Sequence, residues 1–336
     1  MKWKVSTILE IALNSQKIKR LARGTLNNIV WLILILCIVI FSSTIDGYFN
    51  IRNYINILSN SAFIGILAVG ESYCLISGNL DLSIESVAGY SAIFSAWLAG
   101  SSLSSSGFDI NPYIALALCL VVGMIVGFIN SYLVLKLKIN AFLVTLSTYI
   151  IIKGLAITLT RGAGVSMLPG SFRLVETIKI FNISLIPIIM IIIYVIFHFT
   201  LENTQFGAHL FIMGGNINAA YNFGVNVKSI IYRVFILSGV LSALSGWLIT
   251  AKANGANPTM ASGMLFEVLA AVVIGGVSLQ GGVGSLLGVF AGVLLLSSIR
   301  SALNIMAISP FITEVIRGLL VLFAIIVDSI KRLFLK

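Results

Sequence analysis

The sequence contains few charged residues. Only 10% of its 336 residues are Asp, Glu, Lys or Arg, whereas roughly a quarter would be charged in a soluble globular domain. Hydrophobic residues make up 59% of the chain, and the mean hydropathy is +1.08. This composition excludes a soluble domain, a coiled coil and a disordered chain. It indicates a protein that crosses a membrane several times.

Cysteine and histidine are also scarce. Cys37, Cys74 and Cys119 each stand alone in apolar surroundings, which favours small buried side chains over metal ligands or disulfide partners. His198 and His209 are isolated from each other, so we interpret them as structural or interfacial residues. The sequence contains no HExxH or CxxC motif and no nucleophile–base set. We therefore expect no catalytic residues, no metal site and no cofactor, and a membrane-embedded enzyme is disfavoured.

The sequence lacks a nucleotide-binding loop as well. No Gly-x-x-x-x-Gly-Lys-Ser/Thr occurs, and the glycine cluster within residues 275–284 has no lysine to hold a phosphate. We expect that the chain does not hydrolyse ATP itself. The net charge of +10 comes from Lys and Arg dispersed among short segments between apolar runs. That pattern is typical of membrane orientation, and we expect no nucleic-acid partner.

The apolar runs predict an all-α, polytopic membrane protein with about ten transmembrane helices. The first run follows a basic segment, residues 1–26, and is too long for a signal peptide, so we interpret it as an uncleaved helix. Whether the spans near Asp81 and Gly281 are broken or short is left open. The predicted spans are 28–45, 54–77, 83–100, 113–135, 141–160, 183–200, 230–251, 263–280, 284–304 and 311–330.

Ten spans place both termini on one side of the membrane, and the basic residues predict that this side is the cytoplasm. The cytoplasmic side would hold Lys2, Lys4, Lys17, Lys19, Arg20, Arg23, Lys136, Lys138, Lys228, Arg233, Lys331, Arg332 and Lys336. The outer side would hold only Arg52, Arg161, Arg173, Lys179, Lys252 and Arg300.

Glycines are concentrated in the stretch Phe266–Ser298. A cluster of five (Gly275, Gly276, Gly281, Gly282 and Gly284) separates two apolar segments. Gly284, Gly288 and Gly292 then recur at four-residue spacing, which lets helix backbones approach closely in a bilayer. We expect a tight turn between the eighth and ninth spans, followed by a helix that packs against another helix through these glycines.

Two connections are long. Residues Arg161–Asn182 are expected to form an external loop, and Leu201–Ser229 the largest internal one. Within the internal loop, Ile217–Phe223 has the length of a short helix flanked by Gly215 and Gly224. We interpret this helix as a docking element on the cytoplasmic face. An ordinary amphipathic connector is the alternative.

Several ionisable residues lie within or beside the predicted spans. Such residues usually face a cavity or a partner, because a charge at mid-bilayer costs about 2.5 to 3.5 kcal/mol on insertion scales. Asp81, followed by Ser83, alternatively caps a helix that begins near Ile84. Glu267 is expected either to contact the translocation path or to pair with a neighbouring helix. Lys153 is expected to snorkel or to pair with a carboxylate.

Four segments, taken together and in this order, resemble the integral membrane permeases of binding-protein-dependent ABC importers, in the branch that includes the ribose, xylose and arabinose permeases. The first segment runs from Asn56 to Asp81-Leu82-Ser83, and the second from Ala141 to Ala156. The third runs from Gly214 to Val227, and the fourth from Glu267 to Gly284. The sequence departs from the family pattern at Asn140 (usually proline), Lys153 (usually arginine), Val277 (often threonine) and Glu85 (usually glycine).

The resemblance implies a single permease domain, residues 1–336, in the cytoplasmic (inner) membrane of a bacterium. Its implied partners are cytoplasmic ABC ATPase subunits, an extracytoplasmic solute-binding protein, and a second permease in a homodimer or a heterodimer. The segment 201–229 would be the loop that couples the permease to the ATPase, with small alanines seated in a groove of the ATPase. Its motif residues are Gly214, Gly215, Asn216, Ala219, Ala220 and Gly224.

The resemblance also implies residues that contact the binding protein and the solute. Outer basic residues, Arg161, Arg173 and Lys179, are candidates for docking the binding protein by charge complementarity. Hydroxyl and amide groups suited to a neutral sugar are available at Thr145, Ser147, Thr148 and Asn304. Helix packing is the alternative role for each of these polar residues.

The sequence does not identify the solute. The resemblance points to a monosaccharide such as ribose, and related permeases carry autoinducer-2, nucleosides or branched-chain amino acids. An ion-coupled secondary transporter is a further alternative, although the spans hold few paired ionisable residues of the kind that ion coupling uses.

Overall fold

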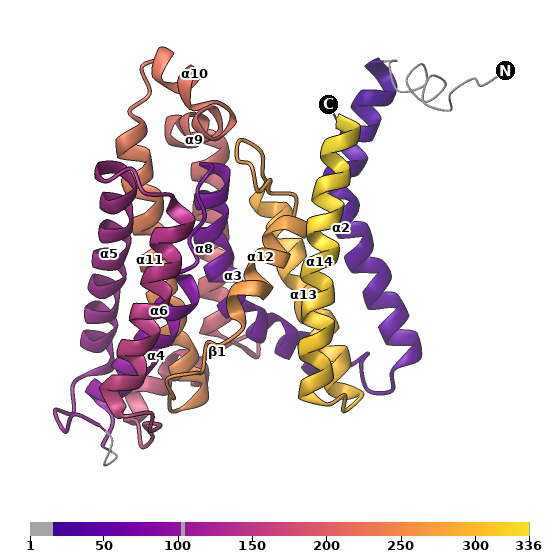
Figure 1. Cartoon of the computed structure of the whole chain (residues 1–336). Coiled ribbons are helices and arrows are strands. Elements are labelled where there is room, and N and C mark those ends of the chain that lie inside the picture. Colours follow the sequence, from indigo (N-terminus) through magenta and orange to yellow (C-terminus); the bar gives the residue numbers. More distant parts are fainter. Residues whose placement is uncertain (1–15, 102–104, 336) are drawn as a thin grey trace.

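The computed structural model describes residues 16–101 and 105–335 and is mostly helical, with one small two-stranded hairpin (Figure 1). The elements in chain order are α2 (Gln16–Thr44), α3 (Ile51–Ile76), α4 (Ile84–Ala99), α5 (Pro112–Lys136), α6 (Ala141–Thr160), η1 (Gly170–Arg173), α7 (Leu174–Thr177), β1 (Lys179–Ile180), β2 (Ile183–Ser184), α8 (Leu185–Asn203), α9 (Gln205–Gly215), α10 (Ile217–Asn222), α11 (Val227–Ala253), α12 (Met264–Ile274), α13 (Leu286–Ile305) and α14 (Pro310–Leu335).

Asparagine begins many of these helices. A side-chain oxygen that accepts a backbone N–H satisfies one of the donors that the first helical turn leaves unpaired. Asparagines at positions 50, 111, 140, 216 and 226 do this for α3, α5, α6, α10 and α11. Local sequence therefore sets where these helices start, including α6, whose cap Asn140 departs from the family's proline.

Helices α3 and α11 form the centre of the protein, and most of their residues are buried. Small residues allow α11 to lie close to its neighbours. Gly123 and Gly127 of α5 face Gly239 and Phe235 of α11 so closely that a Cβ atom at either position would collide with backbone carbonyl oxygen. This is the close approach that glycine permits between helices in a membrane.

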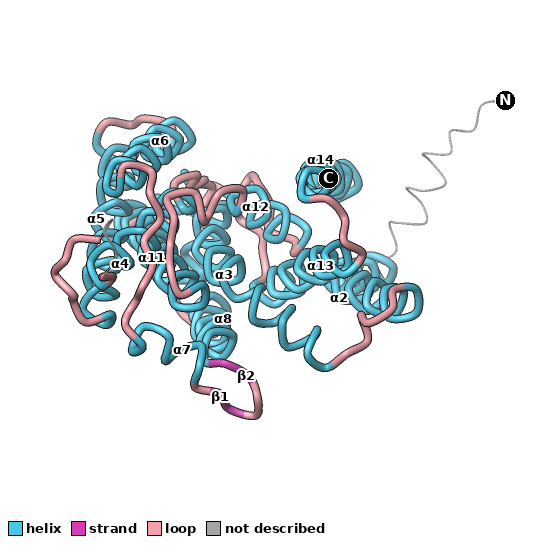
Figure 2. The backbone as a smooth tube through the Cα atoms, turned by 90° about the horizontal axis from the view of Figure 1, so that it is seen from below, coloured by secondary structure: helices cyan, strands magenta, loops and turns pink. Residues whose placement is uncertain are grey.

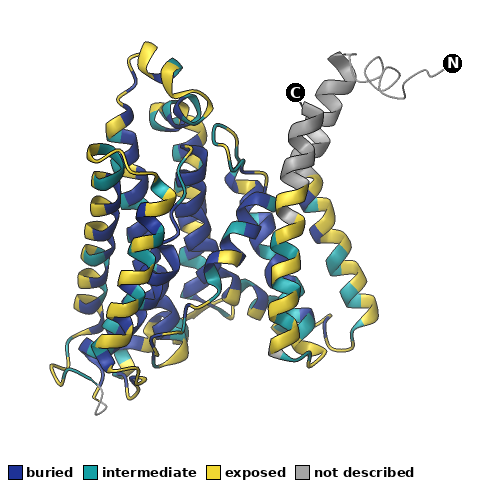
Figure 3. Cartoon of the chain, viewed as in Figure 1, coloured by how far each residue is buried: buried dark blue, intermediate teal, exposed yellow. Residues whose placement is uncertain are grey.

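Helices α5, α6 and α8 surround this centre and expose large apolar side chains on their outward faces (Figure 3). Within the described chain, six helices are long and apolar enough to cross a membrane: α3, α5, α6, α8, α11 and α13. An exposed apolar surface of this extent is suited to lipid. The protein is therefore a multi-pass membrane protein, whereas the count of about ten spans stays a prediction.

Two of the predicted spans contain helices that are shorter than the predicted ranges. The segment 83–100 forms α4, which has 16 residues, and the segment 263–280 contains α12, which has only 11. At 1.5 Å per residue α12 is roughly 16 Å long, about half of a bilayer's hydrocarbon core. Backbone that is not helical occupies the remainder on both sides of α12.

The two ends of the molecule differ. Helices α9 and α10 lie at one end, together with the start of α2 and the end of α14 (Figure 1). The connection 161–184 lies at the opposite end and forms η1, α7 and the β1–β2 hairpin. The hairpin is a departure from the all-α expectation. Its strands are joined by Phe181 and Asn182, which both adopt the positive φ that a tight two-residue turn requires. Of the basic N-terminal segment 1–26, residues 1–15 lie outside the described residues, as does Lys336.

Viewed from below, α2, α13 and α14 form one side of the molecule, and α4, α5, α6 and α11 form the other (Figure 2). Helices α3 and α12 lie between the two sides. α12 is therefore positioned to contact both of them, and the polar contacts at its first turn do so.

Candidate functional site

The break between α3 and α4 holds a buried carboxylate. Gly78, with a φ of 79°, ends α3 and lets the chain reverse towards α4. Asp81 is 1% exposed and accepts three hydrogen bonds. One Oδ accepts from the Ser83 backbone N–H (3.0 Å) and hydroxyl (2.5 Å), and the other accepts from the Ser238 hydroxyl of α11 (2.7 Å). Asp81 thus organises the turn before α4 and ties it to α11, while Ser83 is the N-cap residue.

This polar cluster extends into α5 and α6. The Asn130 amide donates to the Ser83 hydroxyl (3.1 Å), and the Thr148 hydroxyl donates to the Asn130 carbonyl oxygen (2.6 Å). The Thr145 hydroxyl bonds to the Leu80 carbonyl at 3.2 Å. The hydroxyls of Thr145 and Thr148 therefore serve the packing of α6 against the α3–α4 break.

Asn304, another of the four path candidates, is separate from Thr145 and Thr148. It is exposed near the end of α13, which lies on the other side of the molecule. Ser147 is exposed on α6 and bonds within its own helix, so the structure does not bring the four path candidates together. Their common feature in the sequence was polarity alone, which does not distinguish a packing residue from a pore-lining one.

Glu71 is a buried acidic residue that the sequence reasoning missed. It lies within α3, is fully buried, and accepts the Asp81 backbone N–H at 3.4 Å. Its second oxygen has no hydrogen-bond partner among the described residues. The available signal was a carboxylate in the middle of the apolar run Ala62–Ile76, where an ionisable residue is costly.

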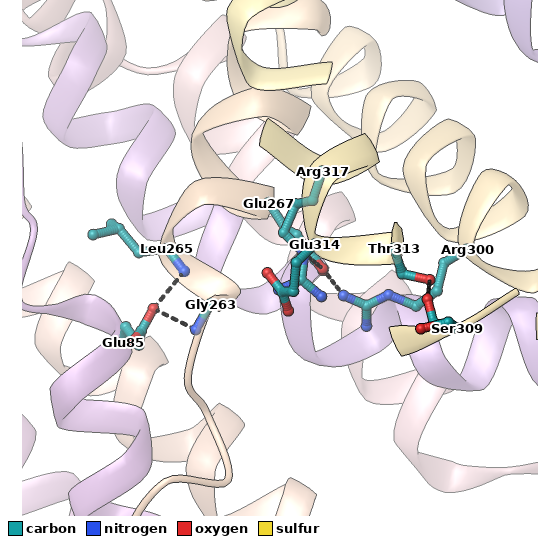
Figure 4. A network of polar contacts seen from close by, with 9 residues as sticks. All are labelled: Glu85, Gly263, Leu265, Glu267, Arg300, Ser309, Thr313, Glu314 and Arg317. Carbon is teal, nitrogen blue, oxygen red and sulfur yellow. Dashed lines mark hydrogen bonds and ion pairs between the residues drawn. The ribbon is translucent and has the colours of Figure 1, made fainter. Parts of the chain in front are cut away.

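A second polar cluster surrounds the first turn of α12 (Figure 4). Glu85 of α4 accepts hydrogen bonds from the backbone N–H groups of Gly263 (3.1 Å) and Leu265 (3.0 Å). Its other oxygen accepts from the Tyr149 hydroxyl (3.1 Å), which in turn accepts from the Lys153 ammonium (3.1 Å). The Glu85 carboxylate thereby accepts two backbone N–H groups at the start of α12 that have no partner within the helix. Lys153 reaches a carboxylate through Tyr149.

Glu267 lies on the other side of the same turn and makes ion pairs with Arg300 of α13 and Arg317 of α14, the latter at 2.6 Å (Figure 4). Glu314 also pairs with Arg317. Of the two interpretations of Glu267, the structure shows pairing with neighbouring helices. These charges join α12, α13 and α14 within their spans.

The glycine-rich segments meet at one point, which we call the glycine junction: Gly78, Gly214, Gly215, Gly281 and Gly282. The Gly282 N–H donates to the Ile76 carbonyl at the end of α3 (2.9 Å). A Cβ on Gly214 would lie 1.7 Å from the same carbonyl oxygen, and a Cβ on Gly281 would lie 2.9 Å from backbone atoms of Gly78. The α9–α10 connection, the α3–α4 break and the α12–α13 loop are therefore in direct backbone contact.

The remaining glycines of this stretch pack α13 against α12 and α3. A Cβ on Gly288 or Gly292 would collide with the carbonyl oxygens of Gly275 and Ala271, respectively. Gly284 faces the Ile76 side chain. Gly276 has no such neighbour and adopts a φ of 96°, which supplies the turn that follows α12.

The loop motif forms the short helix α10, whose cap Asn216 accepts the N–H groups of Asn218 and Ala219. Gly224, with a φ of 71°, follows its last turn. Ala220 is fully buried in the protein's own core, so it is not available to a groove on an ATPase. The expectation is therefore wrong for Ala220, whereas Ala219 is only half-buried and its place in such a groove stays a prediction.

The three outer candidates, Arg161, Arg173 and Lys179, are all exposed and lie in the connection opposite to α10. Arg161 is the left-handed C-cap of α6, Arg173 ends η1, and Lys179 begins β1. All three therefore belong to one surface segment, residues 161–184.

A multi-pass helical fold with buried polar breaks between its helices is typical of membrane transport proteins. The chain belongs to the family described as "Branched-chain amino acid transport system / permease component", whose sequence profile matches residues 53–325.

Several relatives cover nearly all of the chain. It is 30% identical over 300 residues to the ribose import permease protein RbsC of Haemophilus influenzae, covering 88% of this chain and 91% of the relative. It is 33% identical over 304 residues to the L-arabinose transport system permease protein AraH of Escherichia coli, covering 90% of each. It is 32% identical over 302 residues to the autoinducer 2 import system permease protein LsrC of Photorhabdus luminescens, covering 90% and 89%. No solved structure matches the chain.

Proposed function

We propose that this chain is the transmembrane permease subunit of a binding-protein-dependent ABC importer. It forms the path for a monosaccharide such as ribose or another simple sugar in the cytoplasmic membrane of a bacterium. ATP hydrolysis on separate subunits drives the cycle, and an extracytoplasmic binding protein delivers the solute. A second permease, identical or related, completes the path. Both termini and α10 face the cytoplasm in this arrangement.

The observation that carries the proposal is the glycine junction. A helix at one end of the molecule, α10, follows Gly214 and Gly215, which touch both the α3–α4 break and the α12–α13 loop. Movement imposed on α10 is therefore passed to two interruptions inside the membrane-embedded part through backbone contact, without a flexible linker. An importer driven by a separate ATPase needs such a mechanical connection.

The exposed face of α10 suits a protein partner. Ile217, Tyr221 and Phe223 are 47%, 56% and 76% exposed at an end of the molecule that lies outside the lipid-facing helices. Apolar side chains gathered on a protruding helix are typical of an interaction site. These side chains, rather than the buried Ala220, are the ones we assign to a groove on the ATPase.

The proposal is tested in proteoliposomes that contain the permease. Solute uptake is expected only when ATP, the cognate ATPase and the binding protein are all present. Uptake driven by an ion gradient without these partners would replace the proposal with a secondary transporter. A ligand screen on the partner binding protein distinguishes a monosaccharide from autoinducer-2, a nucleoside or a branched-chain amino acid.

The α10 contact is tested separately. Replacing Ile217 and Phe223 by Ser is expected to weaken ATPase binding by more than about tenfold, since each buried side chain of this size contributes about 1.5 to 3 kcal/mol. Binding is measured by titrating the ATPase onto the permease in nanodiscs. Asn222→Ser, on the same exposed turn, is the matched control and should bind normally. Equal affinity of the double variant and this control would exclude α10 as the docking helix.

A further inference from the structure

Lys153 holds a charge deep within α6. It lies seven residues before the end of the helix at Thr160, about 10 Å at 1.5 Å per residue. A lysine facing lipid would extend its ammonium to the nearer membrane surface. Lys153 instead bonds to Tyr149, one turn further from that end. Its ammonium is thus directed towards the middle of the membrane, where it requires polar surroundings.

Irregular backbone also extends from the outer end into the membrane-embedded part. After α11 ends at Ala253, the chain pairs Val165 with Ala256 near the outer end and then runs to the start of α12. That start contacts Glu85, which lies about 20 Å along α4 from its outer end. Such backbone is tolerated at membrane depth only when protein buries it or when it lines a water-filled cavity.

The side chains of this segment favour a cavity. Polar side chains recur along it and are exposed: Asn254, Asn257, Thr259 and Ser262. The apolar residues Ala256, Pro258 and Ala261 alternate with them and are buried. A row of exposed polar groups leading from the outer end to the first turn of α12 indicates a wet surface rather than a lipid-facing one.

A small pocket of about 10 Å³, enough for about one water molecule, lies where this row ends and is partly open to the outside. It is lined by Glu85, Tyr149, Lys153 and Ser262, with Gly89 and Pro258 forming apolar walls. The Glu85 oxygens are occupied by Tyr149 and by the first turn of α12. An ammonium has three donors, and Lys153 uses one of them on Tyr149. The remaining donors and the Ser262 hydroxyl are the groups that this pocket offers to a ligand.

We propose that Lys153, Tyr149 and Ser262 form one wall of a solute-contact site for a neutral polyhydroxylated molecule, at the end of this polar row. The Glu85 carboxylate, one hydroxyl away from the ammonium, balances its charge, so the site has no net preference for an anion. Two neighbouring hydroxyls of a sugar could bind here, because the Lys153 ammonium donates hydrogen bonds and the Ser262 hydroxyl both donates and accepts them. A branched-chain amino acid would need an apolar pocket and a counter-ion for each end. This inference rests on the proposed function and specifies its solute class.

The first test asks whether Lys153 faces water. Single cysteines are placed at 153 and at Ile151, which points to the opposite, lipid-facing side of α6, after Cys37, Cys74 and Cys119 are replaced by Ala in the full transporter. A charged, membrane-impermeant thiol reagent added from outside is expected to modify position 153 at least about tenfold faster, because only thiolate in water reacts. Equal rates at the two positions would overturn the proposal.

The second test uses transport. With saturating binding protein, Lys153→Met is expected to lower sugar uptake about tenfold, as loss of a charged hydrogen bond would. ATPase activity without solute should stay within twofold of wild type, and Lys153→Arg should restore most of the uptake. Unchanged uptake, or a parallel loss of ATPase activity, would overturn the site while wild-type uptake still supports the importer. Absence of wild-type uptake with all partners present would instead refute the proposed function.

Discussion

Three of the buried carboxylates, Asp81, Glu85 and Glu267, are each matched to their own partners. Asp81 receives three donors from Ser83 and Ser238, and Glu267 lies against two guanidinium groups. Glu85 receives two backbone N–H groups and a hydroxyl. An unpaired charge at these depths would cost several kcal/mol. Each carboxylate therefore also joins helices that are far apart in the sequence.

Asp81 is expected to be the most sensitive of these positions. Asp81→Ala removes the acceptor for all three hydrogen bonds, and Ser238→Ala removes a single donor. We predict destabilisation of about 3 kcal/mol or more for the first and about 1 to 3 kcal/mol for the second. The measurement is the free energy of unfolding of the purified protein in mixed micelles with increasing denaturing detergent.

Ser147→Ala provides the control for this pair. The Ser147 hydroxyl is exposed and bonds only to the Leu143 carbonyl within its own helix. Its replacement is expected to change stability by less than about 0.5 kcal/mol. If all three variants unfolded alike, Asp81 would not be the organising residue of the α3–α4 break.

Glycine determines how the helices and loops pack. In α5, α11 and α13 it allows backbone-to-backbone contact, whereas in the α12–α13 loop it supplies positive φ angles at positions 276, 281 and 282. The consequence is a set of close contacts that no larger residue fits. The end of α9, just before α10, shares one of these contacts with the α3–α4 break and the α12–α13 loop.

Two adjacent glycines allow a sharp test of the glycine junction. A Cβ on Gly214 would overlap the Ile76 carbonyl, while a Cβ on Gly215 has nothing within 4 Å. We predict that Gly214→Ala lowers the number of solute molecules moved per ATP hydrolysed, and lowers the thermal midpoint, because backbone on three segments must shift. Gly215→Ala should leave both quantities near wild type. Equal behaviour of the two variants would contradict transmission through the glycine junction.

The whole molecule has two chemically distinct ends. One carries α10 with exposed apolar side chains, and the other carries the 161–184 connection with exposed Arg161, Arg173 and Lys179. With the proposed orientation, the first end meets an ATPase and the second a binding protein. The pocket at Lys153 lies between them, on a row of polar groups that opens towards the second end.

Charge reversal tests this polarity. Arg173→Glu is expected to slow association of the binding protein several-fold at low salt, with the difference shrinking as salt screens the charges. Association is measured by surface plasmon resonance on permease nanodiscs. Lys136→Glu, an exposed basic residue at the end of α5 nearer α10, should leave association unchanged. An effect of equal size at both positions would indicate a general charge effect rather than docking.

Much of the secondary structure was readable in the sequence because its causes are local. Every predicted span contains or overlaps a helix, and the short helix at Ile217–Phe223 is present as α10. Apolar runs and capping asparagines act over a few residues, so a short stretch of sequence is enough to predict the helices that they form. The family was also readable, since four ordered segments indicated it before the profile match to residues 53–325.

The packing around these helices was decided by tertiary structure. Nothing near Glu85 in the sequence shows that it caps α12, about 180 residues away, and nothing near Ala220 shows that it is buried. The glycine stretch was recognisable as a tight turn, but its contact with Gly214 requires two loops to meet at the end of α3. Such contacts depend on which helices lie side by side, and long-range packing alone sets that arrangement.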